Sequence, residues 1–100
     1  MRHVEFIVIL DDRVRKRHIH EIEKGILISF AVQLETKIDE EWKTVIRYDT
    51  AHGSAHIDKF DKKGNKEKTY LDMDWKTILS LADWEINNNW ESYIKKFLGK

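Results

Sequence analysis

The chain of 100 residues contains no cysteine, no proline and only four glycines. The lack of cysteine excludes disulfides, thiolate nucleophiles and cysteine-based zinc sites. The lack of proline-rich or glycine-rich stretches leaves no recognisable linker, so we expect one domain, residues 1–100. No apolar run is long enough to span a bilayer, and we therefore expect no membrane association. A chain without a disulfide framework suits a reducing cytosol, which predicts a cytoplasmic location.

Charge of one sign is not in excess, because 18 Lys and Arg residues balance 18 Asp and Glu residues. The whole molecule therefore has no general attraction for nucleic acid. Basic residues nevertheless gather in two stretches, and a local patch can bind a polyanion on a neutral protein. The first stretch contains Arg13, Arg15, Lys16 and Arg17, and the second contains Lys59, Lys62, Lys63, Lys66 and Lys68.

Apolar and β-branched residues, which make up much of the first 70 positions, predict antiparallel strands. The first strand, over residues 4–10, is rich in Val and Ile, and we expect it to be mostly buried. Polar turns are expected at residues 39–41 and 61–65. The strands are expected over residues 4–10, 26–35, 42–49, 56–60 and 66–71.

Residues 12–24 allow two interpretations. Val14, His18 and Ile22 recur at helical spacing, and Gly25 would suit the C-terminal cap of a helix. The same residues could instead form a charged, extended arm, in which His18 and His20 would share a face. We favour a helix or an irregular arm slightly.

The C-terminal region has apolar residues every three or four positions from Trp75 to Phe97. This spacing predicts one helix over residues 75–98, or two helices broken near residues 87–89, with Asp72 or Asp74 as the N-terminal cap. The predicted fold class is α+β: an antiparallel meander sheet of four to five strands with a C-terminal helix, or two helices, packed on it.

The segment RYDTAHGSAHID, residues 47–58, combines a strand end, a loop and a strand start. Loops on a rigid support commonly carry functional side chains. In extended strands Arg47 and Asp49 point the same way, as do His56 and Asp58. If the loop folds back as a hairpin, the two pairs can converge on one face, with His52 in the loop between them.

These residue types suit acid–base chemistry on a phosphodiester. His52 and His56 can transfer protons near neutral pH, Asp49 can orient an imidazole, and Arg47 can hold a phosphate. They suffice for metal-independent RNA cleavage, in which the 2′-hydroxyl attacks and neither a metal nor another cofactor is needed. Asp58 is a possible fifth member of this catalytic group. The predicted substrate-binding residues are Arg13, Arg15, Lys16, Arg17 and Lys59.

Two other interpretations of the segment stay open. Arg47 and Asp49 could form an ordinary ion pair, with His52 in a plain turn and His56 as a half-exposed strand residue. Alternatively, Asp49, His52 and His56 could bind a metal ion from the loop. The flanking strands and Gly53 argue against the helical form of such a metal motif.

Three blocks of the sequence are distinctive: Arg47-Tyr48-Asp49-Thr50-Ala51-His52 with His56 downstream, Gly64-Asn65, and Asn88-Asn89-Trp90-Glu91-Ser92-Tyr93 with Phe97-Leu98. Through these blocks the chain resembles, over most of its length from Val4 onward, a family of short prokaryotic proteins of unassigned function. More distantly, the first block resembles the arginine, aspartate and paired-histidine motif of TumE-like toxins. That resemblance implies action on RNA and carries over to Arg47, Asp49, His52 and His56.

The leading hypothesis is a toxin-like protein of a toxin–antitoxin pair, acting as a metal-independent ribonuclease through its paired histidines. Its partners would be RNA and an antitoxin protein, and a homodimer is also considered. The alternative is a non-catalytic protein-binding or nucleic-acid-binding module that uses the sheet edge or the C-terminal helix. Whether the chain is an enzyme is left open by the sequence.

Overall fold

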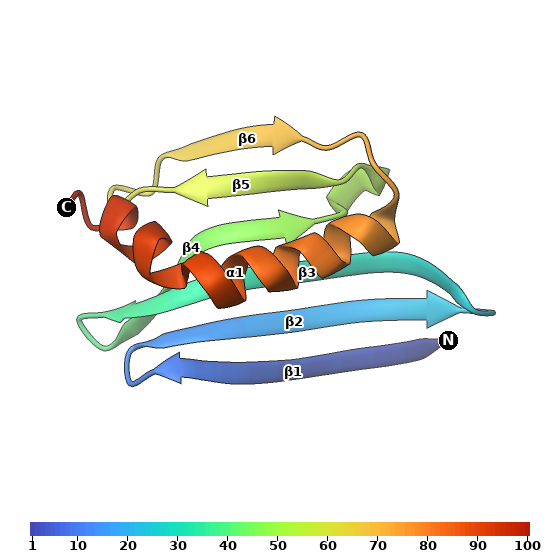
Figure 1. Cartoon of the computed structure of the whole chain (residues 1–100), viewed down its shortest axis with the longest axis horizontal. Coiled ribbons are helices and arrows are strands. Elements are labelled where there is room, and N and C mark those ends of the chain that lie inside the picture. The colour runs from blue at the N-terminus through green and yellow to red at the C-terminus, as the bar shows by residue number, and fades with distance from the viewer.

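Six consecutive strands form one antiparallel sheet, and a single long helix follows them, as the computed structural model of residues 1–100 shows (Figure 1). Each strand pairs with the next one along the chain, so the sheet order is the sequence order. The elements are β1 (Arg2–Asp11), β2 (Val14–Glu23), β3 (Ile26–Ile38), β4 (Glu41–Asp49), the 3₁₀ turn η1 (Ala51–Gly53), β5 (His56–Phe60), β6 (Lys66–Tyr70) and α1 (Trp75–Phe97).

The expected α+β class, with an antiparallel meander and a C-terminal helix, is confirmed. The expected number of four to five strands is wrong, because the sheet has six. The helix is unbroken through residues 87–89. Of the two capping candidates, Asp74 is the cap, since its carboxylate accepts a hydrogen bond from the Thr77 backbone N–H at 3.2 Å.

The missing strand is β2, which occupies the stretch for which a helix or irregular arm was slightly favoured. That preference is wrong. Nine residues of β1 and most of β3 pair with β2 on its two sides, so its backbone hydrogen bonds go to neighbouring strands. Cross-strand pairing decides the conformation here, and the helical spacing of Val14, His18 and Ile22 is incidental.

Two tight turns set the register of the central hairpins. Lys24 and Gly25 join β2 to β3, and Asp39 and Glu40 join β3 to β4. All four residues have positive φ, which is the backbone of the two-residue turn that matches the twist of antiparallel strands.

The main core lies between α1 and one face of the sheet. Figure 1 shows α1 crossing the middle of the sheet, where it packs on β3 and β4. Side chains from β3 and β4 meet Ile78, Ala82 and Ile86 of the helix there. None of the helices combines the length and apolar character that a membrane span needs. The buried sheet residues of this core include Phe30, Val32, Leu34, Ile46 and Tyr48.

The expectation that the first strand is mostly buried is wrong, because most residues of β1 are exposed. β1 is an edge strand, and α1 does not reach across the sheet to cover it (Figure 1). Phe6, Ile7, Val8 and Ile9 are therefore all partly open to solvent.

Polar contacts join β2 to the helix beside this core. The buried Lys16 ammonium group donates to Asn87 Oδ1 at 2.9 Å and lies 3.0 Å from Asp83 Oδ1. His18 Nδ1 lies 3.3 Å from the same carboxylate, and His18 Nε2 lies 2.7 Å from His20 Nδ1. The pKa of His20 is lowered, mainly by partial burial and next by the nearby His18. The extended alternative was right that His18 and His20 share a face.

Replacing Ile86 by Ala tests the contribution of helix packing. Ile86 is fully buried, so the change removes apolar contact and leaves a cavity, and we expect a loss of about 3 kcal/mol in the free energy of unfolding. Urea denaturation followed by circular dichroism measures it. Trp84→Ala, at an exposed position of the same helix, is the control and should change stability by less than about 1 kcal/mol. Equal effects of the two changes would contradict this packing.

Candidate functional site

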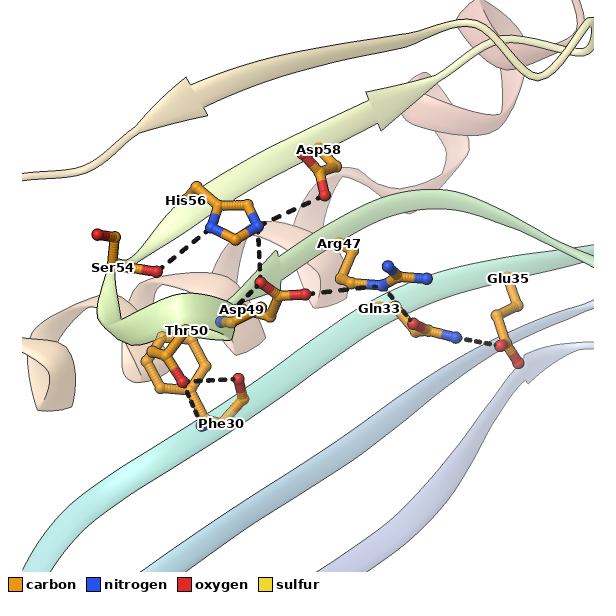
Figure 2. A network of polar contacts seen from close by, with 10 residues as sticks. Phe30, Gln33, Glu35, Arg47, Asp49, Thr50, Ser54, His56 and Asp58 are labelled. Carbon is orange, nitrogen blue, oxygen red and sulfur yellow. Dashed lines mark hydrogen bonds and ion pairs between the residues drawn. The ribbon is translucent and has the colours of Figure 1, made fainter.

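The segment of residues 47–58 folds back as the β4–β5 hairpin. Asp49 pairs directly with His56, and Arg47 pairs with Asp58. The four side chains consequently lie together on the sheet face opposite α1, which we call the open face (Figure 2). The structure thus brings together four residues that the sequence analysis singled out.

His56 is at the centre of this group and is buried. Its Nε2 lies 2.7 Å from Asp49 Oδ1 and 3.5 Å from Asp58 Oδ2. Its Nδ1 lies 3.3 Å from the backbone carbonyl oxygen of Ser54, to which an Nδ1–H can donate (Figure 2). One side of the imidazole is therefore held by the backbone, while the other side faces two carboxylates.

Asp58 has an incomplete set of partners. Its side chain is 3% exposed, and Oδ1 has no hydrogen-bond partner. Lys68 stands opposite Asp58 in the β5–β6 register, but its ammonium group lies 5.9 Å from the centre of the Tyr70 ring and forms no ion pair with Asp58. A buried carboxylate oxygen without a partner is costly, and such groups are concentrated at functional sites.

Arg47 connects this group to a polar network that crosses the sheet (Figure 2). Its Nε donates to Gln33 Oε1 at 2.9 Å and lies 4.0 Å from Asp49 Oδ2. Gln33 in turn donates to the buried carboxylate of Glu35, which also accepts from Arg15 Nε at 2.5 Å. The network runs from β5 to β2, so each charged side chain is positioned by its neighbour on the next strand.

Thr50 anchors the hairpin to β3. Its buried hydroxyl accepts a hydrogen bond from the Phe30 backbone N–H at 3.0 Å and lies 3.4 Å from the Phe30 carbonyl oxygen. The Thr50 backbone N–H also donates to the Phe30 carbonyl at 3.1 Å. These contacts fix the point at which β4 ends and the 3₁₀ turn begins, and with it the place of Asp49.

His52, the second predicted catalytic histidine, lies in η1 and is exposed. Its backbone is left-handed, with φ of 63°, and its side chain makes no hydrogen bond or ion pair. The structure therefore holds His56 in the group and leaves the imidazole of His52 exposed in the turn, without a contact to the group.

The five predicted substrate-binding residues do not form one patch. Lys16 faces α1, whereas Arg15 and Arg17 lie on the open face with Glu35 between them. Arg13 is at the β1–β2 turn, where its guanidinium donates to the Lys37 carbonyl at 2.9 Å. Lys59 is exposed on β5. A run of basic residues on a strand alternates between two faces, which separates its members.

A cationic cleft that the sequence did not single out adjoins the group. Strands β4 and β5 pair only between Ile46–Lys59 and Asp49–His56. The start of β4 is therefore separated from the β5–β6 turn. The cleft between them has a volume of about 400 Å³. The only sequence feature that pointed to this cleft is the stretch of basic residues around position 62. The lining residues are Trp42, Lys43, Thr44, Arg47, Phe60, Asp61, Lys62, Lys63, Gly64 and Phe97.

Arg47 belongs to both the cleft and the Asp49–His56–Asp58 group. Its guanidinium carbon lies 5.8 Å from the centre of the Phe60 ring, within reach of a cation–π contact. On the same face, the Arg15 guanidinium stacks 4.0 Å from the centre of the Trp42 ring. The cleft thus continues into the polar network without an intervening element.

Comparison with known proteins places the chain in a family. Residues 1–100 match the family described as "Domain of unknown function (DUF7718)", and the chain belongs to it. No curated protein and no solved structure matches the chain. The expected membership of a family of unassigned function is confirmed, while the match makes no link to TumE-like toxins.

Replacing Thr50 by Val tests whether the anchor holds the hairpin. The change keeps the shape but leaves the Phe30 N–H without its side-chain acceptor, so we expect a loss of about 2 kcal/mol in the free energy of unfolding. Faster hydrogen exchange at the Phe30 amide should accompany it. Thr69→Val is the control, because Thr69 is exposed on β6 and its hydroxyl makes no hydrogen bond. Unchanged exchange at Phe30 in Thr50→Val would refute the anchoring role.

Proposed function

We propose that this protein binds single-stranded RNA in the cationic cleft and across the adjoining open face. The observation that carries the proposal is the composition of the cleft, which combines four cationic side chains with three aromatic rings. A groove that pairs positive charge with stacking surfaces is the usual way in which proteins hold single strands. The four cations are Lys43, Arg47, Lys62 and Lys63, and the rings are Trp42, Phe60 and the largely buried Phe97.

The charges of the cleft favour an anion. The one carboxylate in its lining, Asp61, accepts hydrogen bonds from the Lys63 and Asn65 backbone N–H groups at 2.9 and 3.0 Å. A further bond from the Asn65 side chain holds the pKa of Asp61 below its usual value. Asp61 is thus occupied in building the turn, and Lys62 and Lys63 project from that turn into the cleft lining.

The arrangement of the aromatic side chains also suits nucleic acid. Arg15 covers the Trp42 ring, and Arg47 lies near the Phe60 ring. A guanidinium on an aromatic ring offers a flat, positively charged surface on which a base can stack while a phosphate binds its edge. A chain with no net charge can bind RNA in this way because the basic residues are local.

Reversing the charge of the two lysines in the β5–β6 turn tests RNA binding. In Lys62→Glu/Lys63→Glu, the affinity for a fluorescent oligouridine should fall about tenfold or more, because phosphate contacts are lost. The dependence of log affinity on log salt concentration should also become shallower, by about 0.7 per lost contact. Fluorescence anisotropy over a salt series measures both quantities.

The matched control carries the same change of charge elsewhere. Lys76 and Lys95 are exposed on α1 and do not line the cleft. Lys76→Glu/Lys95→Glu should retain nearly the wild-type salt slope. If both double variants bind equally, or if the wild type does not bind oligouridine, the proposal is wrong.

A second candidate function is cleavage of the bound RNA, as a metal-independent ribonuclease of a toxin–antitoxin pair. It is supported by the convergence of Arg47, Asp49, His56 and Asp58 beside the cleft and by the resemblance of the central block to TumE-like toxins. In this scheme Asp49 orients His56 for proton transfer, His52 supplies the second imidazole, and Arg47 stabilises charge on the phosphate.

Expression of the chain without a partner tests this second candidate. The wild type should stop growth and degrade RNA, and His56→Gln should lower the cleavage rate about 100-fold or more. Cleavage by the purified protein should continue in EDTA. His3→Gln, at an exposed position on β1, is the control and should behave as the wild type. Normal growth and intact RNA on expression of the wild type would exclude this function.

A further inference from the structure

Three oxygen and nitrogen donors converge inside the Asp49–His56–Asp58 group. One ligand atom from each residue lies within 4.8 Å of the other two. His56 Nε2 lies 2.7 Å from Asp49 Oδ1 and 3.5 Å from Asp58 Oδ2. Ligand atoms at about 2.1 Å from a tetrahedral zinc ion lie about 3.4 Å apart. The His56–Asp58 spacing matches that of a coordination shell, and the His56–Asp49 pair would have to open by about 0.7 Å to admit the ion.

The backbone selects the form of His56 that can bind a metal. Nδ1 faces the Ser54 carbonyl oxygen at 3.3 Å, and a carbonyl accepts a hydrogen bond only from a protonated nitrogen. In the neutral ring, the proton therefore stays on Nδ1, and the lone pair of Nε2 points at the two carboxylates. A backbone carbonyl on the far nitrogen is the usual partner of a metal-bound histidine.

The electrostatics of the group require a positive charge at this point. A lone pair and two carboxylates facing one another repel, and the nearest fixed cation, Arg47, lies 4.0 Å from the outer oxygen of Asp49. Asp58 receives no ion pair from any lysine or arginine. Either a proton on Nε2 or a metal ion between the three residues can supply the charge.

The unpartnered oxygen of Asp58 favours the metal ion. A proton on Nε2 satisfies Asp49 at 2.7 Å, but it leaves Asp58 Oδ1 without a partner on a side chain that is 3% exposed. A cation can bind the carboxylate of Asp58 directly and offset the cost of burying it. The burial of this oxygen without a partner does not follow from the clustering of the three residues.

We propose that Asp49, His56 and Asp58 bind one divalent transition-metal ion, zinc or manganese, on the open face. Two carboxylates and one imidazole suit these ions, whereas a site for magnesium would have mainly oxygen ligands. Three protein ligands leave a position for water or substrate. Asp49 also borders a shallow hollow of about 260 Å³ with Thr50 and Ala51, so solvent reaches the site on the side of Asp49.

This metal site differs in composition from the one that the sequence suggested, since Asp58 takes the place of His52 as the third ligand. It does not depend on RNA binding in the cleft. It does exclude the metal-independent ribonuclease scheme, because a metal on Nε2 prevents His56 from exchanging a proton. The sensitivity of any RNA cleavage to EDTA therefore separates the two mechanisms.

The test is metal binding by the full chain after dialysis against EDTA. Isothermal titration with Zn²⁺ and with Mn²⁺ should show one saturable site per chain for at least one of them, with weaker binding of Mg²⁺. The same ion should raise the Tm, since it binds only the folded protein. In ¹⁵N NMR spectra, the His56 Nε2 resonance should shift on addition of Zn²⁺ while Nδ1 remains protonated.

Variants then assign the ligands. Asp58→Asn and His56→Gln should each weaken binding by about 100-fold or more, with folding checked by circular dichroism. His20→Gln removes a histidine of the β2 pair outside the site and should bind as the wild type. The proposal is overturned if neither Zn²⁺ nor Mn²⁺ binds saturably to the wild type. It is also overturned if binding survives in Asp58→Asn, or if only His20→Gln abolishes it.

Discussion

The ion pair between Asp49 and His56, at 2.7 Å across the β4–β5 hairpin, is the contact around which the open face is organised. It exists because antiparallel register places the two residues opposite each other, and because Thr50 fixes the end of β4 against Phe30. A one-residue slip of either strand would turn its member of the pair toward α1 and separate the two side chains. Arg47 and Asp58 occupy the next pair in the same register, so the whole group depends on this alignment.

The two faces of the sheet differ in composition and in what covers them. On one face α1 covers β3 and β4 and forms an apolar core. No element covers the other face, and its central residues are charged side chains that shield one another, from Asp58 through Arg47 and Glu35 to Arg15. Buried polar groups rigidify a site when all of them have hydrogen-bond partners. A buried polar group that lacks a partner marks a place where a ligand can bind. Asp58 is the unsatisfied member.

The sequence predicted the class of fold well because most elements obey a local rule. Apolar and β-branched residues between polar turns gave five of the six strands correctly in outline, and the 3.6-residue period of the C-terminal region gave α1. β2 was not predicted as a strand because its helix-facing side includes Lys16 and His18 rather than apolar residues. The polar groups of these two side chains have partners in Asp83 and Asn87 of α1. Partners more than 60 positions away in the chain leave no local pattern.

The candidate site, like the fold, has one part that local sequence predicts and another that depends on residues far apart in the chain. Residues 47–58 could be selected from their chemistry and spacing, and the convergence of Arg47, Asp49, His56 and Asp58 needed only the assumption of a hairpin. The cleft could not be found in this way. It arises where β4 and β5 cease to pair, and its lining joins Trp42 to a turn about 20 residues later and to Phe97 at the end of the helix. The burial of Asp58 likewise depends on tertiary packing.

The central claim is that the open face and its cleft are the functional surface, and the four tryptophans allow a direct measurement. Trp42 lines the cleft, whereas Trp75, Trp84 and Trp90 belong to α1. In a titration of ¹⁵N-labelled protein with a short single-stranded RNA, the indole N–H signal of Trp42 should shift together with the Arg47 Nε–H. The three helix indoles should stay in place. Shifts confined to α1, or none at all, would contradict the account.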